Sequence, residues 1–143
     1  MKKILLFSIM LTFFMGSMSC EAQNKQKQQQ SEKTLSEKVE VYYFHYTRRC
    51  VTCNTVESET KKHLETLYPE LVKNGKITFA SINLEEASSK VTAEKCGATG
   101  QSLLVVSGNK KTDLTQAGFM YARSQPDKLK AEIKSAIDPL VKK

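Results

Sequence analysis

The 143-residue sequence has little glycine, proline or cysteine, with six, three and four of each. So few glycines and prolines exclude collagen-like repeats and low-complexity chains built on these two residues. Four cysteines are too few for a small scaffold held together by many disulfides in a chain of this length. No internal repeat is visible, so the length predicts one modest domain with short appendages.

A concentrated run of basic residues is also missing. The 22 Lys and Arg outnumber the 15 Asp and Glu and give a net charge of +7, but the lysines are scattered along the chain. Loss of residues 1–19 would remove Lys2 and Lys3 and leave 20 basic and 15 acidic residues, a net charge of +5. Such a distribution favours solubility and weak attraction to anionic surfaces, and it does not indicate a nucleic-acid partner.

The one long apolar segment lies at the N-terminus. Residues Ile4–Met15 form a run of about a dozen, short of the roughly 20 residues that span a bilayer. The run follows Lys2 and Lys3, which together with its length is typical of a signal peptide. Residues 1–19 are therefore predicted to be a signal peptide of the lipoprotein type.

The end of this segment, Ser17-Met18-Ser19-Cys20, resembles a bacterial lipoprotein box, although that box usually has Leu or Val where this sequence has Ser17. The cysteine of such a box is diacylated and becomes the mature N-terminus. We therefore expect a lipid on Cys20 that anchors the protein in a membrane, facing the periplasm or the exterior. Cleavage after Ala22 and an uncleaved anchor are the alternatives, and all three predict export to the cell envelope.

Residues 20–38 are rich in Gln, Lys, Glu and Ser, and Leu35 is their one large apolar side chain. Such a segment cannot bury enough apolar surface to offset its conformational entropy. It is predicted to be a flexible tether, with a polar helix that extends the fold as the alternative. The folded domain is predicted over residues 39–143.

Hydrophobic periodicity in this domain predicts alternating strands and helices. The predicted strands cover residues 39–45, 76–84, 102–106 and 114–120, and the predicted helices cover residues 52–73, 86–95 and a last segment from Pro126. The order is βαβαββα, and the last two strands form a hairpin. It predicts an α/β fold with a central mixed sheet flanked by helices, in which the first two strands are parallel.

Individual residues of the predicted helix over residues 52–73 indicate where it breaks, where it ends and which side faces the core. Pro69 is expected to kink or divide it, and Asn74-Gly75 is expected to end it. Its apolar stripe has a gap that either Thr60 or His63 fills, and His63 is otherwise expected to be half-exposed on the surface.

The chemistry-bearing motif lies where the first strand ends and this helix begins, in the run Arg48-Arg49-Cys50-Val51-Thr52-Cys53. A thiolate is the reactive form of cysteine, and a helix N-terminus offers unpaired N–H groups and the positive end of a dipole. Two adjacent guanidinium groups further favour the thiolate of Cys50. The motif therefore predicts that Cys50 is the nucleophile and that Cys53, more buried one turn later, is the resolving thiol.

Two other uses of the motif stay open. A zinc site usually shows two such cysteine pairs, and here only Cys96, His45 and His63 are available to complete one. A purely structural disulfide within one helical turn would close so short a loop that it stabilises little. The predicted site contains no metal and no cofactor.

The element order together with C-x-x-C at the strand–helix junction resembles the thioredoxin fold over about residues 39–138. More narrowly, the stretch YYFHYTRRCVTC is similar to the small exported thioredoxin-like proteins of the ArsF type, known as a nitrophenyl compound nitroreductase subunit. The resemblance implies dithiol–disulfide exchange through a Cys50–Cys53 disulfide with protein or small thiol substrates. The stretch CGATGQSLLVV and Gly118 resemble the loop before the third strand and an edge-strand glycine of thioredoxins. A monomer is expected.

This sequence departs from thioredoxin at three places. The motif reads Arg-Cys-Val-Thr-Cys, Ser102 stands where that family has a cis-proline facing the disulfide, and residues 41–49 contain no Asp or Glu. His45 is then the candidate proton acceptor for Cys53, with packing against its aromatic neighbours as the alternative. The missing proline also favours a second function, in which the reduced dithiol binds a soft metal or arsenite.

Further expectations concern the residues near the motif, its redox couple and a third function. Tyr46 and Ser102 are predicted to form part of a substrate groove, while the other aromatic residues near Tyr46 pack in the core. Cys96 is expected to be a small buried apolar residue, or else a third sulfur that reaches the motif. Stabilisation of the Cys50 thiolate predicts a couple more oxidising than that of thioredoxin. A third function, an interaction module in which the cysteines are incidental, completes the alternatives.

Overall fold

A computed structural model describes residues 38–142 of the chain. The predicted signal peptide over residues 1–19, the predicted lipidation site Cys20 and all of the predicted tether except Lys38 lie outside the described residues. Among residues 38–142, no helix is both long enough and apolar enough to cross a bilayer.

The described elements follow the predicted alternation of strands and helices. The strands are β1 (Val39–His45), β2 (Ile77–Asn83), β3 (Ser102–Ser107) and β4 (Lys110–Asp113). The helices are α2 (Val51–Leu67), α3 (Pro69–Lys73), α4 (Lys90–Cys96), α5 (Thr115–Tyr121) and α6 (Pro126–Val141), and the 3-10 turn η1 (Ala87–Ser89) precedes α4.

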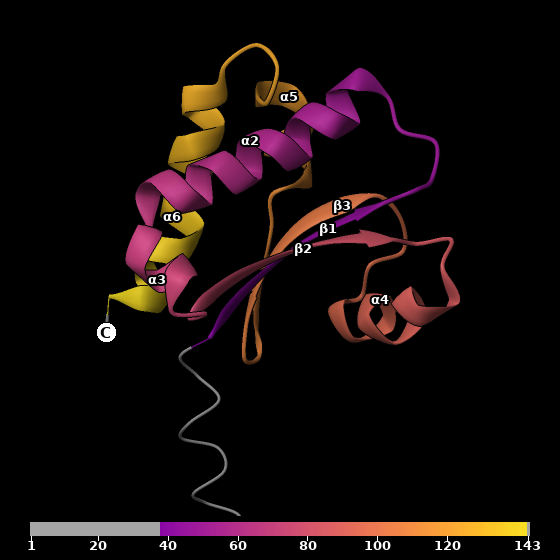
Figure 1. The fold of residues 1–143 in the computed structure, drawn as a ribbon, viewed down its shortest axis with the longest axis horizontal. Helices are drawn as coiled ribbons and strands as arrows, with labels where there is room; N and C mark the ends of the chain where they lie inside the picture. Colours follow the sequence, from indigo (N-terminus) through magenta and orange to yellow (C-terminus); the bar gives the residue numbers. More distant parts are fainter. Residues whose placement is uncertain (1–37, 143) are drawn as a thin grey trace, which may run out of the picture. The chain divides into compact units, whose positions relative to one another are not determined.

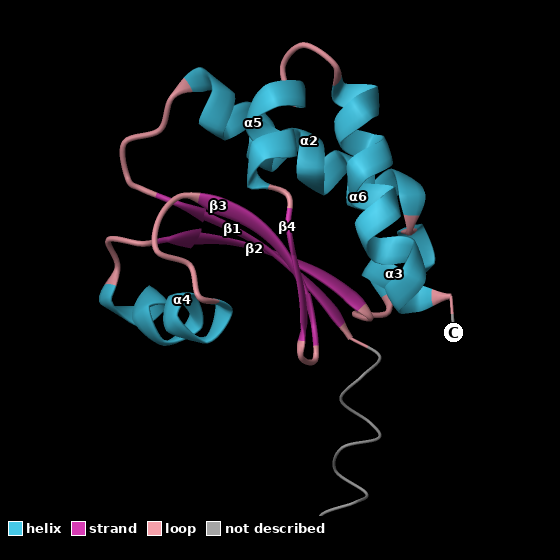
Figure 2. Ribbon diagram, turned by 180° about the vertical axis from the view of Figure 1, so that it is seen from behind, coloured by secondary structure: helices cyan, strands magenta, loops and turns pink. Residues whose placement is uncertain are grey.

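The strands form one mixed sheet in the order β2-β1-β3-β4 (Figure 1). Strand β2 is parallel to β1, while β3 is antiparallel to both β1 and β4. Helices α2, α3, α5 and α6 cover one face of the sheet, and α4 with η1 covers the other (Figures 1 and 2). The predicted α/β class with a central mixed sheet flanked by helices is confirmed, and its layout is thioredoxin-like.

Strand β1 is buried on both faces because its side chains alternate between two cores. Val39, Val41 and Tyr43 face the larger core beneath α2 and α6, and none of them is more than 1% exposed. Phe44 faces the smaller core beneath α4, which it shares with Leu104 of β3. A central strand between two helical layers therefore needs the nearly continuous apolar and aromatic sequence that β1 has.

Pro69 divides the first predicted helix into α2 and α3. Tyr68 ends α2 with φ −136° and ψ 49°, outside the helical region, because the ring of a following proline disfavours helical geometry. Pro69 then occupies the first turn of α3, where its missing N–H leaves no helical hydrogen bond unmade. Gly75, with φ +75°, follows α3 as predicted.

The predicted strand over residues 114–120 is wrong, since Thr115–Tyr121 forms helix α5 and the hairpin strand is the shorter β4. The backbone N–H of Leu114 still donates to the carbonyl of Leu103, at 2.8 Å. The next contact differs, because the N–H of Leu103 donates to the Thr115 hydroxyl at 3.0 Å. A side chain thus ends the strand pairing, and the Asp113 carboxylate accepts the Thr115 N–H at the start of α5.

Gly118 lies inside α5 and not on an edge strand, which corrects the expectation drawn from the thioredoxin resemblance. It is buried, as are Leu114 and Ala122 four residues before and after it. A Cβ atom at this position would lie 3.2 Å from Cγ1 of Val56 and 3.4 Å from Cδ2 of Leu103. The glycine therefore lets α5 pack closely against both α2 and β3.

His63 is also corrected, because it is 5% exposed and not half-exposed. It lies on the inward stripe of α2 with Thr60 and Leu64. Burial lowers the pKa of the His63 imidazole, and the Glu59 carboxylate, 3.5 Å from Nε2, opposes this effect. Both Thr60 and His63 thus fill the gap in the apolar stripe that the sequence shows.

We expect Gly118→Val to lower the free energy of unfolding by about 1–3 kcal/mol, because the added methyl groups overpack the contact with Val56 and Leu103. Urea unfolding followed by circular dichroism measures this change. The matched control is Gln116→Val on the exposed side of α5, which carries only the helix-propensity cost of a β-branched residue. Equal losses in the two variants would contradict the close-packing role of Gly118.

Candidate functional site

Cys50 occupies the N-cap position of α2. Its backbone is extended, with φ −78° and ψ 166°, and its Sγ accepts the backbone N–H of Cys53 at 3.1 Å. Its carbonyl accepts the N–H of Asn54 in the first helical hydrogen bond. A sulfur atom therefore takes the place that a Ser, Thr or Asp oxygen usually takes at a helix N-terminus.

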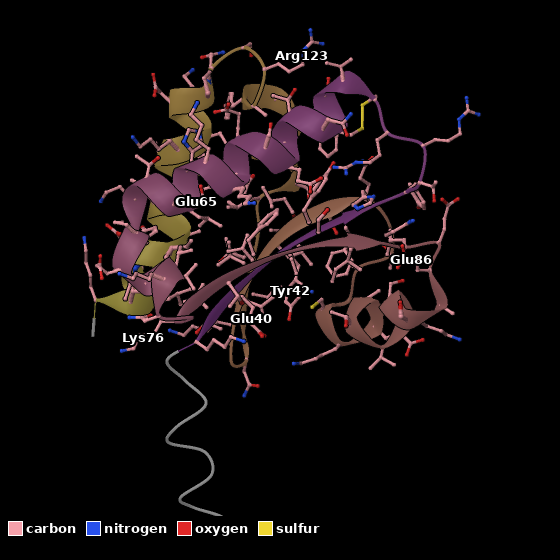
Figure 3. The ribbon with its side chains drawn as sticks, viewed as in Figure 1. Glu40, Tyr42, Glu65, Lys76, Glu86 and Arg123 are labelled. Carbon is pink, nitrogen blue, oxygen red and sulfur yellow. A yellow bond between two sulfur atoms is a disulfide. The ribbon has the colours of Figure 1, made fainter. Side chains whose placement is uncertain are left out.

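Cys50 and Cys53 form a disulfide with their Cα atoms 5.1 Å apart, within the usual range. The yellow bond in Figure 3 shows it at the amino end of α2. Cys50 is exposed, whereas Cys53 is 5% exposed. One sulfur atom is thus presented to solvent and the other is protected by the body of the domain.

The loop between β1 and α2 is held by the segment that follows β2. The Thr47 N–H donates to a Glu85 carboxylate oxygen at 2.7 Å, and the Asn83 side-chain amide donates to the Thr47 hydroxyl at 2.9 Å. The hydrogen bonds from Thr47 lower the pKa of Glu85. The adjacent Leu84 N–H donates to the carbonyl of His45 at 2.8 Å. These bonds orient the chain just before it reaches the disulfide.

Arg49 points into the domain, although it was predicted to support the Cys50 thiolate together with Arg48. Its guanidinium group forms an ion pair with Glu57 of α2 and lies 5.6 Å from the centre of the Tyr43 ring. Arg48 is exposed to solvent. The Arg49 charge is therefore shared with a carboxylate and an aromatic face, while Arg48 is the more open cation of the pair.

Tyr43 links this ion pair to the loop before β3. The Gln101 side-chain amide donates to the Tyr43 hydroxyl at 3.1 Å. Burial raises the pKa of Tyr43, and the Gln101 hydrogen bond and the Arg49 charge oppose the change. Three segments thus meet beneath the amino end of α2 through one connected set of polar side chains.

Tyr46 and Ser102 were predicted to share a groove, and both lie close to Gly100: Tyr46 in the loop after β1 and Ser102 at the start of β3. A Cβ atom on Gly100 would lie 3.6 Å from the Tyr46 hydroxyl, and Ser102 Oγ donates to the Gly100 carbonyl at 3.1 Å. Tyr46 is 43% exposed, and the neighbouring Val51 in the motif is 68% exposed. No peptide bond in residues 38–142 is cis, so Ser102 does not reproduce the cis-proline geometry.

His45 lies at the end of β1 with its ring 5.9 Å from that of Tyr43, and its Nδ1 hydrogen-bonds to the Tyr46 carbonyl at 2.9 Å. The aromatic packing that the sequence offered as one alternative is therefore present. The proposed proton transfer from Cys53 stays a prediction.

Cys96 is 3% exposed in the smaller core, where it packs with Phe44, Ala93 and Leu104 beneath the opposite face of the sheet from α2. Burial raises the pKa of its thiol. The expectation of a small buried apolar residue is confirmed, and the alternative of a third sulfur reaching the motif is wrong. Within residues 38–142, no three His, Cys, Asp or Glu side chains are grouped as metal ligands.

Glu57 and Gln101 are polar residues near the site that the sequence analysis missed, while Tyr43, to which Gln101 donates, packs in the core as predicted. Residues 41–49 contain no Asp or Glu, and Glu57 reaches the same region from α2. Its position, four residues after Cys53 and hence on the same side of the helix, was the signal available in the sequence.

The fold and site define a thioredoxin-like domain with a C-x-x-C disulfide at its first strand–helix junction. No model of a known protein family matches the chain, and no curated protein matches it either. The site is therefore interpreted from its own geometry.

Glu57→Gln is expected to lower the free energy of unfolding by about 1 kcal/mol, because it leaves the half-buried Arg49 guanidinium without its counter-charge. Glu65→Gln is the matched control, since Glu65 is an exposed carboxylate on the same helix and its loss should cost less than about 0.5 kcal/mol. Chemical denaturation at neutral pH measures both changes. A Glu57 variant as stable as the Glu65 variant would show that the ion pair contributes nothing.

Proposed function

We propose that this protein is a thiol–disulfide oxidoreductase of the cell envelope that works through Cys50 and Cys53. One observation carries the proposal: an exposed cysteine starts α2, and its disulfide partner lies buried one turn later. This arrangement presents one sulfur to a substrate while the second waits within bonding distance.

The reaction needs two thiol–disulfide exchanges. In the reducing direction, the Cys50 thiolate attacks one sulfur of a substrate disulfide, forms a mixed disulfide and releases the other substrate sulfur as a thiolate. The Cys53 thiolate then attacks Cys50 Sγ, forms the Cys50–Cys53 disulfide and releases the second substrate sulfur. Two electrons pass from the protein to the substrate, and the two leaving thiolates take up the protons that the cysteines lose. An external dithiol reverses the sequence.

Three local features favour Cys50 as the attacking thiolate. Its sulfur accepts the Cys53 N–H and lies at the positive end of the α2 dipole. The first turn of α2 contains no acidic residue that would repel the charge. Arg48, two residues before Cys50 in the sequence, adds an exposed cation. Hydrogen bonds and positive charge both stabilise the ionised form.

The surroundings suit a protein or small-molecule disulfide as substrate. Tyr46 and Val51 place exposed apolar surface before and after Cys50 in the sequence. Ser102 adds a hydroxyl, which donates to the carbonyl of Gly100. Such surface excludes water from a docked disulfide without demanding one particular charge. We assign Tyr46 and Ser102 to substrate positioning on this ground.

The finer assignments rest on the sequence. The resemblance to ArsF-type proteins supports an exported thioredoxin-like protein, and the box ending at Cys20 supports a lipid anchor in the cell envelope. The proposal requires no cofactor and takes the chain as a monomer.

Cys50→Ser is expected to abolish exchange between the reduced full-length chain and glutathione disulfide, because it removes the nucleophile. Cys53→Ser should instead accumulate a glutathione mixed disulfide on Cys50, since the resolving thiol is absent. Intact-mass spectrometry after acid quenching distinguishes the two products. Cys96→Ala is the control and should retain exchange, because Cys96 is buried in the other core.

Retention of exchange in Cys50→Ser would overturn the assignment. If the wild-type dithiol exchanged nothing but bound arsenite one-to-one, and both motif variants lost that binding, the motif would be a binding site. Absence of both activities would leave only a docking role for the domain.

We expect the pKa of the reduced Cys50 thiol to lie below the value of about 8.5 typical of free cysteine. The couple should then be more oxidising than that of thioredoxin, whose potential is about −270 mV. The pH dependence of iodoacetamide alkylation measures the pKa, and equilibration with glutathione measures the potential. Arg48→Gln should raise the pKa slightly, whereas Lys110→Gln at the distant edge of the sheet should leave it unchanged. An ordinary thiol pKa would contradict the role of the helix terminus.

A further inference from the structure

The two edges of the sheet differ in their side chains. Strand β4 is short and exposed along its whole length, and it carries two lysines and an aspartate among its four residues. Strand β2, at the opposite edge, has seven residues with the sequence ITFASIN and no charge, proline or glycine. Charged residues on an edge strand discourage further strand pairing, and β2 lacks this protection.

In the part of the chain that the structure describes, no strand pairs with the outer side of β2. Among residues 38–142, β1 is the only strand that pairs with β2, and its register runs without a bulge from Val39–Ile77 to His45–Asn83. A strand paired on one side directs alternate backbone N–H and C=O groups outward, where another strand can bond to them.

A groove lies between this edge and helices α2 and α3. Its volume is about 410 Å³, and Leu64, Val72 and Phe79 contribute apolar surface to its lining. Lys61 and Glu65 contribute charged groups from α2. The groove therefore suits an apolar side chain flanked by polar ones.

A second, polar groove lies at the carboxyl end of β2. Its volume is about 340 Å³, and its lining includes His45, Asn83, Glu86 and Thr92. Ser81 lines both grooves. One strand edge is thus bordered by two recesses of different chemistry.

These features together specify an extended polypeptide as the occupant. Successive side chains of a strand point to opposite faces, so a strand added beside β2 would direct alternate side chains toward the two recesses. A compact ligand would leave the outward backbone groups of β2 unpaired. An apolar side chain alternating with a polar or basic one fits the two linings.

The edge is also continuous with the redox site. Glu57, which lines the first groove, is the ion-pair partner of Arg49. Asn83, in the second groove, donates to Thr47 in the loop that leads to Cys50. Because β1 and β2 are parallel, their carboxyl ends meet at the edge of the sheet from which this loop departs.

We propose that the outer edge of β2 binds an extended segment of a partner polypeptide by strand addition. The partner's identity as the redox substrate rests on the proposed function, while the strand binding itself does not. The bound segment alternates apolar and polar side chains, and its backbone pairs with residues 77–83.

The test uses a fluorescently labelled, carboxymethylated insulin B chain, an unfolded polypeptide with no free thiol, and the oxidised full-length protein. We expect saturable binding by fluorescence anisotropy and slower amide hydrogen exchange over residues 77–83. Ser81→Lys places a cation at the exposed position of β2 and should weaken binding about fivefold or more. Thr112→Lys makes the matched change on exposed β4 and should change binding less than about twofold.

Because the polypeptide has no thiol, the result does not depend on exchange chemistry. Cys50→Ser should bind it as the wild type does, even if the protein proves to lack oxidoreductase activity. No binding, equal binding in Ser81→Lys and the wild type, or protection confined to the Tyr46 and Val51 region would each overturn the proposal. If binding holds, Ser81→Lys should also slow the reduction of insulin while leaving that of glutathione disulfide unchanged.

Discussion

The backbone N–H of Cys53 points at the sulfur of Cys50, and the architecture around the motif maintains this contact. It depends on α2 starting at Val51, because one residue later the sulfur would no longer lie over the open N–H groups of the first turn. The same contact serves both redox forms. It caps the helix when the disulfide is closed, and it can stabilise a thiolate when the disulfide is open.

The start of α2 is maintained from two directions. On the solvent side, Thr47 is hydrogen-bonded to Asn83 at the end of β2 and to Glu85 just after it. On the inner side, Arg49 is held between Tyr43 and Glu57. The residues on either side of Arg48 are therefore anchored, whereas Arg48 itself is exposed to solvent. A buried charge in this position would need a fixed partner, as Arg49 has in Glu57, whereas an exposed charge remains hydrated.

Much of this arrangement could be predicted from local sequence. Strands β1 and β3 and the break at Pro69 follow from side-chain type alone, and so does the motif at the start of α2. Residues 114–120 were misassigned because they are apolar enough for a strand. The Thr115 hydroxyl ends the pairing there, and Gly118 makes room for a helix only because Val56 lies opposite it.

The remaining differences concern neighbours in space. His63 was placed on the surface because histidine is usually polar and exposed, yet the helical phase turns it inward. Glu57 was missed because it lies within α2, whereas its partner Arg49 lies in the loop before that helix. Periodicity predicts which face a residue occupies, but the partner it finds there depends on how the layers pack.

Asp138, near the end of α6, also holds the end of another helix, α2. Its carboxylate accepts hydrogen bonds from Lys134, Lys142 and the Tyr68 hydroxyl. These three hydrogen bonds, those from the lysines most of all, hold the pKa of Asp138 below its usual range. Tyr68 ends α2, so the last turn of α6 fastens the end of that helix remote from the disulfide. Melting of this turn would therefore loosen α2 from its far end.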